Sequence, residues 1–264
     1  MILETDKLTK QFGDLTAVNN VTIAVPQGEI FGLLGPNGAG KSTVIKMLTT
    51  LLPPTSGSAL IANYDVVRQS GAVRRVIGYV PQLLSADGTL TGYENLLIFA
   101  KLYDIPRQER NERIQNALEF MGLLDAAEHP VKTYSGGMIR RLEIAQSMLH
   151  RPRVLFLDEP TVGLDPAARR MVWDHVVQLR DVFSATILLT THFMEEADEL
   201  CQRVAIMHRG TVQVIGAPAE LKASLGNADA TLDDVFMQYA GDTLESGGNY
   251  REVSRQRRTA RRLG

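Results

Sequence analysis

The hydrophobic pattern in the first third of the chain predicts β-strands. Short apolar or alternating segments are bounded there by Gly, Pro, Asn and Thr, which is typical of strands separated by turns. We expect strands over residues 2–8, 21–25, 30–34, 58–62 and 76–80. At about residue 91 the spacing of the apolar residues changes to a helical period, which continues to residue 121.

The segment 83–150 is predicted to form a helical lobe. Thr91 and Glu94 have the capping-box spacing at the start of its first helix, and one face of that helix is apolar through Leu96, Leu97, Ala100 and Leu102. Pro106 separates it from a second helix over residues 107–121, whose many charges more often form a solvated face than a binding patch.

Strand and helix patterns alternate after residue 153. We expect strands over 154–157 and 186–190, and helices over 166–179 and 195–200. Such alternation with short links predicts a mostly parallel sheet flanked by helices.

The last part of the pattern predicts a hairpin and a final helix. The apolar segments 204–207 and 212–215 flank His208-Arg209-Gly210-Thr211, a sequence typical of a turn. A helix around residues 232–239 places four residues on one stripe, namely Leu232, Val235, Phe236 and Tyr239. A stripe of this kind more often covers the protein's own core than binds a partner.

Length and composition narrow the class of protein. The 264 residues are 44% hydrophobic, which suffices for one large domain or one domain with a lobe. A net charge of −2 gives no general attraction to nucleic acid. The single cysteine, Cys201, excludes an intrachain disulfide and fits a reducing cytosol. We expect no signal peptide and no membrane span, so a pore would belong to another polypeptide.

A glycine-rich segment directly follows the predicted strand 30–34. It reads Gly35-Pro36-Asn37-Gly38-Ala39-Gly40-Lys41-Ser42-Thr43. Its glycines let the backbone curl so that successive N–H groups face phosphate oxygens, while Lys41 reaches the β- and γ-phosphates and Ser42 is placed for Mg²⁺. A helix that begins near Lys41 adds the positive end of its dipole. A glycine turn that precedes a lysine by chance is uncommon at this spacing, so the segment predicts a nucleotide site.

A predicted strand later in the chain ends in two acids, Asp158 and Glu159. We expect Asp158 to hold Mg²⁺, mostly through water, because Mg²⁺ keeps much of its hydration shell. Glu159 is a candidate to polarise an attacking water molecule. Taken alone, the segment is equally well explained as a buried strand with a solvated acidic end, but the phosphate loop upstream favours the catalytic interpretation.

Ser135-Gly136-Gly137 precedes residues at helical spacing, among them Leu142, Ala145 and Leu149. The tripeptide therefore lies at a helix N-terminus and offers a hydroxyl and free N–H groups. In isolation it is better explained as a helix cap. A second anion site makes sense if it closes over a nucleotide that another copy of the domain holds.

In this order, the motifs resemble those of the ATP-binding subunits of ABC (ATP-binding cassette) transporters over residues 1–240. The series is Phe12, the Walker A loop at 35–43, Gln82 of the Q-loop, the Ser135-Gly136-Gly137 signature, Walker B ending in Asp158-Glu159, the D-loop Gly163-Leu164-Asp165-Pro166 and the switch residue His192. The resemblance implies an α/β fold: a P-loop NTPase core with a mostly parallel sheet, N-terminal antiparallel strands and a helical signature lobe at about 83–150.

The resemblance also implies the ligands and the role of each motif. ATP and Mg²⁺ are the expected ligands, and a head-to-tail pair of domains would hold two ATPs. Phe12 would stack on adenine, and the other copy would contribute Ser135, Gly136, Gly137 and Asp165. The implied catalytic residues are Lys41, Gln82, Glu159 and His192. The groups implied around the metal are Ser42, Gln82 and Asp158.

Two positions depart from the commonest signature, which begins with Leu and ends with Gln; here they are Tyr134 and Met138. With residues 90–96 and 232–236, they resemble the daunorubicin-resistance-type branch, whose ATPases pair with ABC-2-type membrane permeases. The branch implies export of a hydrophobic drug or lipid, no nucleic acid partner, and a peripheral position on the cytoplasmic face of the inner membrane.

The family receives a helix of the membrane subunit beside the Q-loop. The apolar residues Leu83, Leu84 and Leu90 suit such a helix-in-groove contact, although a local core of the loop explains them too.

The C-terminal residues 241–264 are basic, with six arginines against three acids. We favour a solvated, flexible tail over the alternative, contact with anionic lipid.

Three other functions compete with export of a drug or lipid. A soluble ABC ATPase of translation or DNA maintenance would usually carry a second cassette or long coiled coils, and neither pattern occurs here. An exporter of another cargo, such as polysaccharide or sodium, stays open because the membrane subunit selects the cargo. A simple kinase or GTPase would lack the Ser135-Gly136-Gly137 signature.

Overall fold

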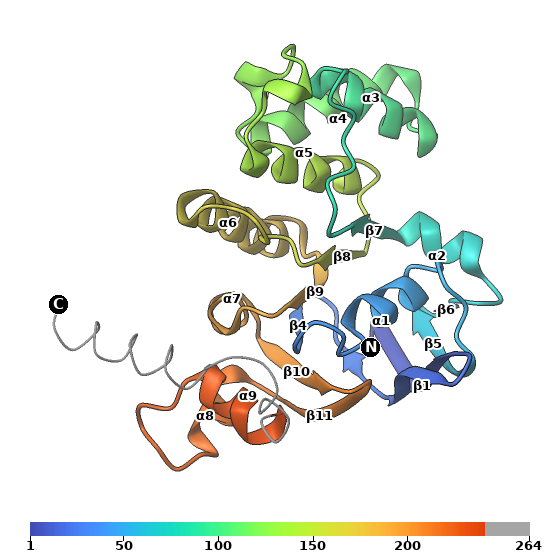
Figure 1. The fold of residues 1–264 in the computed structure, drawn as a ribbon. Helices are drawn as coiled ribbons and strands as arrows, with labels where there is room; N and C mark the ends of the chain where they lie inside the picture. The colour runs from blue at the N-terminus through green and yellow to red at the C-terminus, as the bar shows by residue number, and fades with distance from the viewer. Residues whose placement is uncertain (241–264) are drawn as a thin grey trace, which may run out of the picture.

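A six-stranded sheet lies at the centre of the computed structural model, which describes residues 1–240 (Figure 1). In spatial order its strands are β11 (Thr211–Gly216), β10 (Arg203–His208), β4 (Ile30–Leu34), β9 (Thr186–Thr191), β8 (Val154–Asp158) and β7 (Ile77–Val80). The strands from β10 to β7 are all parallel to their neighbours, and β11 pairs antiparallel with β10. The predicted parallel sheet and terminal hairpin are both confirmed.

The central strands β4, β8 and β9 are buried along their whole length. Alternate residues of each strand enter different cores because side chains in a strand point to opposite faces. In β4, Ile30 and Leu34 join the core beneath the helical lobe, whereas Phe31 and Leu33 join the core shared with the N-terminal strands. Burial on both faces explains why these segments are nearly continuous apolar runs.

A second, antiparallel sheet is built from N-terminal segments. Its strands are β1 (Leu3–Phe12), β2 (Leu15–Val21), β3 (Ala24–Val25), β5 (Ser56–Ile61) and β6 (Tyr64–Asp65). The predicted continuous strand over 21–25 is wrong. The buried Thr5 hydroxyl donates to Val21 O and accepts from Ile23 N, each at 2.9 Å, and so occupies backbone groups that a continuous ladder would use.

Helices cover the central sheet and form the lobe at the top of Figure 1. The α-helices are α1 (Lys41–Leu48), α2 (Ser70–Val76), α3 (Gly92–Leu102), α4 (Arg107–Phe120), α5 (Gly136–Met148), α6 (Pro166–Phe183), α7 (Met194–Leu200), α8 (Pro218–Ala223) and α9 (Leu232–Ala240). Two 3₁₀ turns, η1 (Leu124–Ala126) and η2 (Val131–Thr133), precede α5. Within residues 1–240, no helix combines the length and the apolar character needed to cross a bilayer.

Several elements were not predicted: the strand β2, the 3₁₀ turns η1 and η2, and the short elements β6, α2 and α8. The reason is clearest for α2, which buries a single residue, Val73, and therefore leaves no apolar stripe in the sequence. The strand predicted over 76–80 consequently begins one residue later, at Ile77, after α2 ends.

The lobe consists of α3, α4 and α5, with η1 and η2 between the last two. The predicted capping box is present, because Glu94 N donates to Thr91 Oγ1 at 3.1 Å and Thr91 N donates to Glu94 Oε2 at 2.8 Å. The charged helix α4 buries Ile114 and Leu118 and turns most of its other residues to solvent, as expected. The predicted basic tail, 241–264, lies outside the described residues.

The helix α9 lies against the core of the protein. Leu232 and Val235 are buried, and Phe236 and Tyr239 are half-buried against the same cluster. The apolar stripe therefore serves as a lid, as expected, and is not left free for a partner.

Replacing Leu232 by Ala should lower the free energy of unfolding by about 2–5 kcal/mol, because it leaves a cavity under α9. The exposed Gln238→Ala change on the same helix should stay within about 0.5 kcal/mol. Denaturant unfolding of the full chain measures both. Equal, small effects would mean that α9 does not cover the core.

Candidate nucleotide site

The carboxyl ends of β4, β9, β8 and β7 meet at one edge of the central sheet. Parallel strands end at the same edge, and ligands of open α/β sheets bind there. The segments that follow these strands begin with Gly35, His192, Glu159 and Pro81-Gln82, respectively. The topology thereby brings together four motifs from distant parts of the sequence.

The phosphate loop joins β4 to α1. Gly40 has φ +102°, and a Cβ on it would lie 2.5 Å from the Ala17 carbonyl oxygen of β2. A side chain at this position would therefore collide with backbone. Asn37 and Gly38, at the tip of the loop, are exposed, whereas Ala39 is buried. Ser42 and Thr43, in the first turn of α1, are half-buried.

Lys41 is held beneath this loop. Its side chain is 4% exposed, and its Nζ donates to Gly35 O at 2.8 Å and to Pro36 O at 3.2 Å. The same ammonium lies 3.3 Å from Glu159 Oε1. Lys41 is thus already oriented in the loop, and a bound phosphate would compete with Glu159 for its charge.

Asp158 is the centre of an oxygen cluster. Its Oδ1 accepts from Ser42 Oγ at 3.1 Å and from Thr190 Oγ1 at 2.6 Å. Within residues 1–240, no group of three or more His, Cys, Asp or Glu residues could hold a metal ion. A carboxylate beside a hydroxyl nevertheless fits Mg²⁺, which prefers oxygen ligands and usually binds through one or two carboxylates, water and substrate phosphates.

Glu159 has an unusual backbone conformation. Its φ of +49° lies in the left-handed region, which is uncommon for residues other than glycine. Its amide donates to both oxygens of Thr190, at 3.1 Å to the carbonyl and 3.0 Å to the hydroxyl. These bonds hold the turn that directs the carboxylate across the strand ends.

The Glu159 carboxylate contacts all three of the other predicted catalytic residues. Besides Lys41 on Oε1, its Oε2 accepts from Gln82 Nε2 at 3.2 Å and lies 3.3 Å from His192 Nδ1. The His192 contact has ion-pair distance without hydrogen-bond geometry. A lysine, an amide and an imidazole therefore surround this one carboxylate.

The signature tripeptide does not join this cluster. Ser135 and Gly136 are exposed at the N-terminus of α5, where Ser135 Oγ accepts from Met138 N at 3.3 Å. A Cβ on Gly137 would lie 2.7 Å from Ala168 Cβ, and one on Gly136 would lie 3.4 Å from Leu164. The tripeptide is packed on the start of α6 and keeps its outer side open.

The two unusual signature positions have structural explanations. Tyr134 is 8% exposed, and its hydroxyl donates to Ala126 O at 2.6 Å, within the lobe. Met138 is half-buried against the large core.

The remaining predicted site residues lie at exposed positions. Asp165 is the N-cap of α6, and its Oδ1 accepts from Ala168 N at 2.9 Å. Phe12, at the end of β1, is 48% exposed, with Lys10 Nζ 5.2 Å from its ring centroid. Both side chains have surface open to solvent for a ligand or partner.

Sequence reasoning assigned no role to Thr190, whose hydroxyl links Asp158 and Glu159. The available signal was its place in Thr190-Thr191-His192, the segment that contains the predicted switch residue. Arg140 and Glu143 were also missed, since charges on a helix usually face solvent, yet both side chains are 2% exposed.

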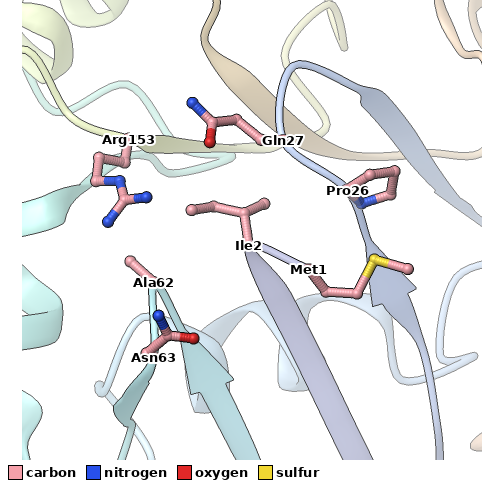
Figure 2. A pocket seen from close by; sticks show the side chains of 7 residues that line it. All are labelled: Met1, Ile2, Pro26, Gln27, Ala62, Asn63 and Arg153. Carbon is pink, nitrogen blue, oxygen red and sulfur yellow. The ribbon is translucent and has the colours of Figure 1, made fainter.

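Figure 2 shows a small hollow near the N-terminus. It has a volume of about 170 Å³ and is lined by Met1, Ile2, Pro26, Gln27, Ala62, Asn63 and Arg153. Gln27 and Arg153 precede the amino ends of β4 and β8, so the hollow lies at the opposite edge of the sheet from the phosphate loop. It is also smaller than typical ligand pockets, which hold about 300–1,000 Å³.

Known proteins are similar in sequence to most of this chain. The family model described as "ABC transporter" matches residues 18–162. The daunorubicin/doxorubicin resistance ATP-binding protein DrrA of Streptomyces peucetius is 46% identical over 85% of this chain and 68% of its own length. The probable multidrug ABC transporter ATP-binding protein YbhF of Escherichia coli is 43% identical over 91% of this chain, which spans only 42% of that relative.

Solved structures are similar over most of the chain. An ATP-binding subunit of an ABC transporter superposes with a TM-score of 0.80 at 29% identity, covering 90% of this chain and 99% of the other. A dimeric ATP-binding cassette, MJ0796 bound to ADP and Pi, gives 0.72 at 26% identity, covering 81% of this chain and 98% of the other.

Gly40→Ala should weaken binding of Mg-ATP by about tenfold or more, because the added methyl displaces the loop from β2. Gly28→Ala is the matched control, since Gly28 also has positive φ (+77°) but open space around its Cβ position. Its affinity should stay within about twofold of wild type. Calorimetric titration measures both, and equal affinities would contradict the role of this close approach.

Proposed function

Because the chain belongs to the ABC transporter family as an ATP-binding and ATP-hydrolysing subunit, we propose that it powers export of a hydrophobic drug or lipid through a separate membrane permease of the ABC-2 type. The observation that carries the export proposal is the similarity to a daunorubicin/doxorubicin resistance ATP-binding protein over most of the chain. The chain would then lie peripherally on the cytoplasmic face of the inner membrane, and the permease would select the cargo.

Two copies of the chain would form each complete nucleotide site. A single copy gathers Lys41, Asp158 and Glu159 at the strand ends but leaves the N-terminus of α5 open, with Ser135 exposed. A helix N-terminus with free N–H groups attracts anions. We infer a head-to-tail pair in which Ser135, Gly136 and Gly137 of one copy close on the γ-phosphate held by the other. Asp165 would contact the partner copy near the same phosphate.

The residues at the strand ends suit hydrolysis of the terminal phosphate. Lys41 would leave Glu159 and pair with the β- and γ-phosphates, which frees the carboxylate. Glu159 would then accept a proton from water while the water oxygen bonds to the γ-phosphorus and the bond to the bridging oxygen breaks, releasing ADP and phosphate. His192 would contact the γ-phosphate and respond to its loss.

Ser42 and Asp158 would hold Mg²⁺ from the chain's side, with Gln82 nearby through its contact with Glu159. When bound, the ion offsets charge on the β- and γ-phosphate oxygens. Thr190 keeps Asp158 in position through its 2.6 Å hydrogen bond. Phe12, exposed at the end of β1, would stack on the adenine.

The membrane permease would dock beside Gln82. Leu83 is 81% and Leu84 51% exposed, whereas Leu90 is half-buried and belongs more to the loop itself. Two adjacent exposed leucines suit an apolar helix face of the permease.

Glu159→Gln should preserve ATP affinity and reduce turnover by about 10²–10⁴-fold, since the amide cannot accept the proton of the attacking water. With saturating Mg-ATP, the variant should accumulate as a dimer. The control is Glu195→Gln, an exposed acid on α7 that should hydrolyse ATP at the wild-type rate. Phosphate release and sedimentation velocity measure these effects. Wild-type turnover, or a strictly monomeric variant even with its membrane partner present, would contradict the two-copy site.

The export proposal is tested by co-purifying the tagged chain from membranes. We expect the tagged chain to retain a permease with about six membrane spans and no periplasmic binding protein. The double variant Leu83→Asp/Leu84→Asp should no longer retain the permease. The control is Leu102→Asp, which alters an equally prominent leucine (70% exposed) at the end of α3. Ribosomes or DNA in place of a permease would overturn the proposal, as would equal retention of all variants.

A further inference from the structure

A buried ion pair on the signature helix α5 plays no part in the site described so far. Arg140 and Glu143 are each 2% exposed, with Arg140 Nη1 3.0 Å from Glu143 Oε2. Burial lowers the pKa of Arg140, although an arginine stays protonated. Burying two charges is costly unless further partners compensate them, so the remaining partners of this pair indicate what it does.

These partners all belong to residues 81–85, which we call the Gln82 segment. Arg140 donates through Nη1 to Pro81 O and through Nη2 to Gln82 O, both at 2.7 Å. Glu143 Oε1 accepts from the amide of Ser85 and, at 3.1 Å, from its hydroxyl. Two side chains from one turn of α5 therefore hold both ends of the Gln82 segment.

The chain just beyond the Gln82 segment is attached to the lobe as well. Asn95 of α3 accepts from Asp87 N at 2.9 Å and donates to Asp87 O at 3.0 Å. Gln146 of α5 donates to Asn95 Oδ1 at 3.4 Å. The backbone from Pro81 to Asp87 is thus fastened to the lobe, although Val80, the residue before it, ends a strand of the central sheet.

The side chain of Gln82 points the other way. Its Nε2 donates to Glu159 Oε2 at 3.2 Å, at the carboxyl end of β8. Gln82 therefore has its backbone on the lobe and its amide on the catalytic carboxylate. A displacement of α5 relative to the sheet would change the Gln82–Glu159 distance directly, because the guanidinium fork leaves its two carbonyl partners little freedom.

We propose that Arg140 and Glu143 are positioning residues that make the Gln82 segment move as one body with α5. The position of the signature helix then sets where the Gln82 amide stands relative to Glu159. Contact at the exposed Leu83 and Leu84, between the two anchored ends, would shift the amide and Ser135 together. The role rests on the proposed ATP hydrolysis at Glu159, and it does not depend on what is exported.

The test is a double-mutant cycle on kcat for Mg-ATP hydrolysis by the full chain. Arg140→Lys keeps the charge but replaces the planar fork by one ammonium, which cannot reproduce both bonds in the same geometry. We expect kcat to fall about tenfold with KM for ATP within about twofold, because the phosphate loop is unchanged. In a Gln82→Ala background the same change should cost less than about twofold, because Arg140 acts through Gln82.

Arg141→Lys is the matched control. Arg141 is also buried, at 8% exposure, but its Nη1 donates to Met121 O at 2.7 Å, within the lobe. Thermal unfolding of each variant separates stability from positioning. An equal loss of kcat in Arg141→Lys, or losses that multiply fully with Gln82→Ala, would overturn the proposal.

If Arg140→Lys fails to fold, Glu143→Gln takes its place in the same cycle. It keeps the size of the side chain and removes its charge, and a loss of about threefold that vanishes in Gln82→Ala is expected. The positioning role would be contradicted if Glu143→Gln left kcat unchanged. It would also be contradicted if its loss of kcat multiplied fully with that of Gln82→Ala. A wild-type chain without ATPase activity would contradict the proposed function as well, whereas an active wild type with multiplicative losses contradicts the positioning role alone.

Discussion

The parallel pairing of β4, β9, β8 and β7 is the constraint on which the rest of the structure depends. The strands are buried on both faces, so polar side chains are accommodated mainly where the strands end. The carboxyl ends form one such edge. The phosphate loop, the Asp158-Glu159 pair, His192 and Gln82 converge there. The two cores on either side of the sheet hold the strand ends in a fixed relation.

Charge at that edge is balanced within the chain itself. Glu159 is nearly buried, and Lys41, Gln82 and His192 surround its carboxylate. A nucleotide that took Lys41 away would leave this carboxylate with weaker partners, as the proposed role of general base requires. The left-handed backbone of Glu159 and the Thr190 hydrogen bonds determine that this carboxylate, and not its neighbour Asp158, faces the lysine.

The lobe adds a second level of control over the same carboxylate. Its signature end is open and suited to a phosphate held elsewhere, while its Arg140–Glu143 pair holds the backbone of the Gln82 segment. Closing of a second copy on Ser135 and the placement of the Gln82 amide would thus be coupled through one rigid helix. Such coupling would give a role to the buried charges of α5, at positions where apolar residues would cost less to bury.

The amino-acid sequence by itself determined the features that depend on local spacing: the phosphate loop, the capping box of α3, the apolar central strands and the lid stripe of α9. Each of these features depends on a few consecutive residues, through their backbone N–H groups or through the period of a helix or strand. Only the tertiary structure decided the break between β2 and β3, the bridging role of Thr190 and the burial of Arg140 and Glu143. Each of these depends on a side chain that meets backbone or carboxylate groups from 16 to 59 residues away, as Thr5 meets Val21 and Arg140 meets Pro81. Nothing in the local sequence distinguishes such a side chain from one that faces solvent.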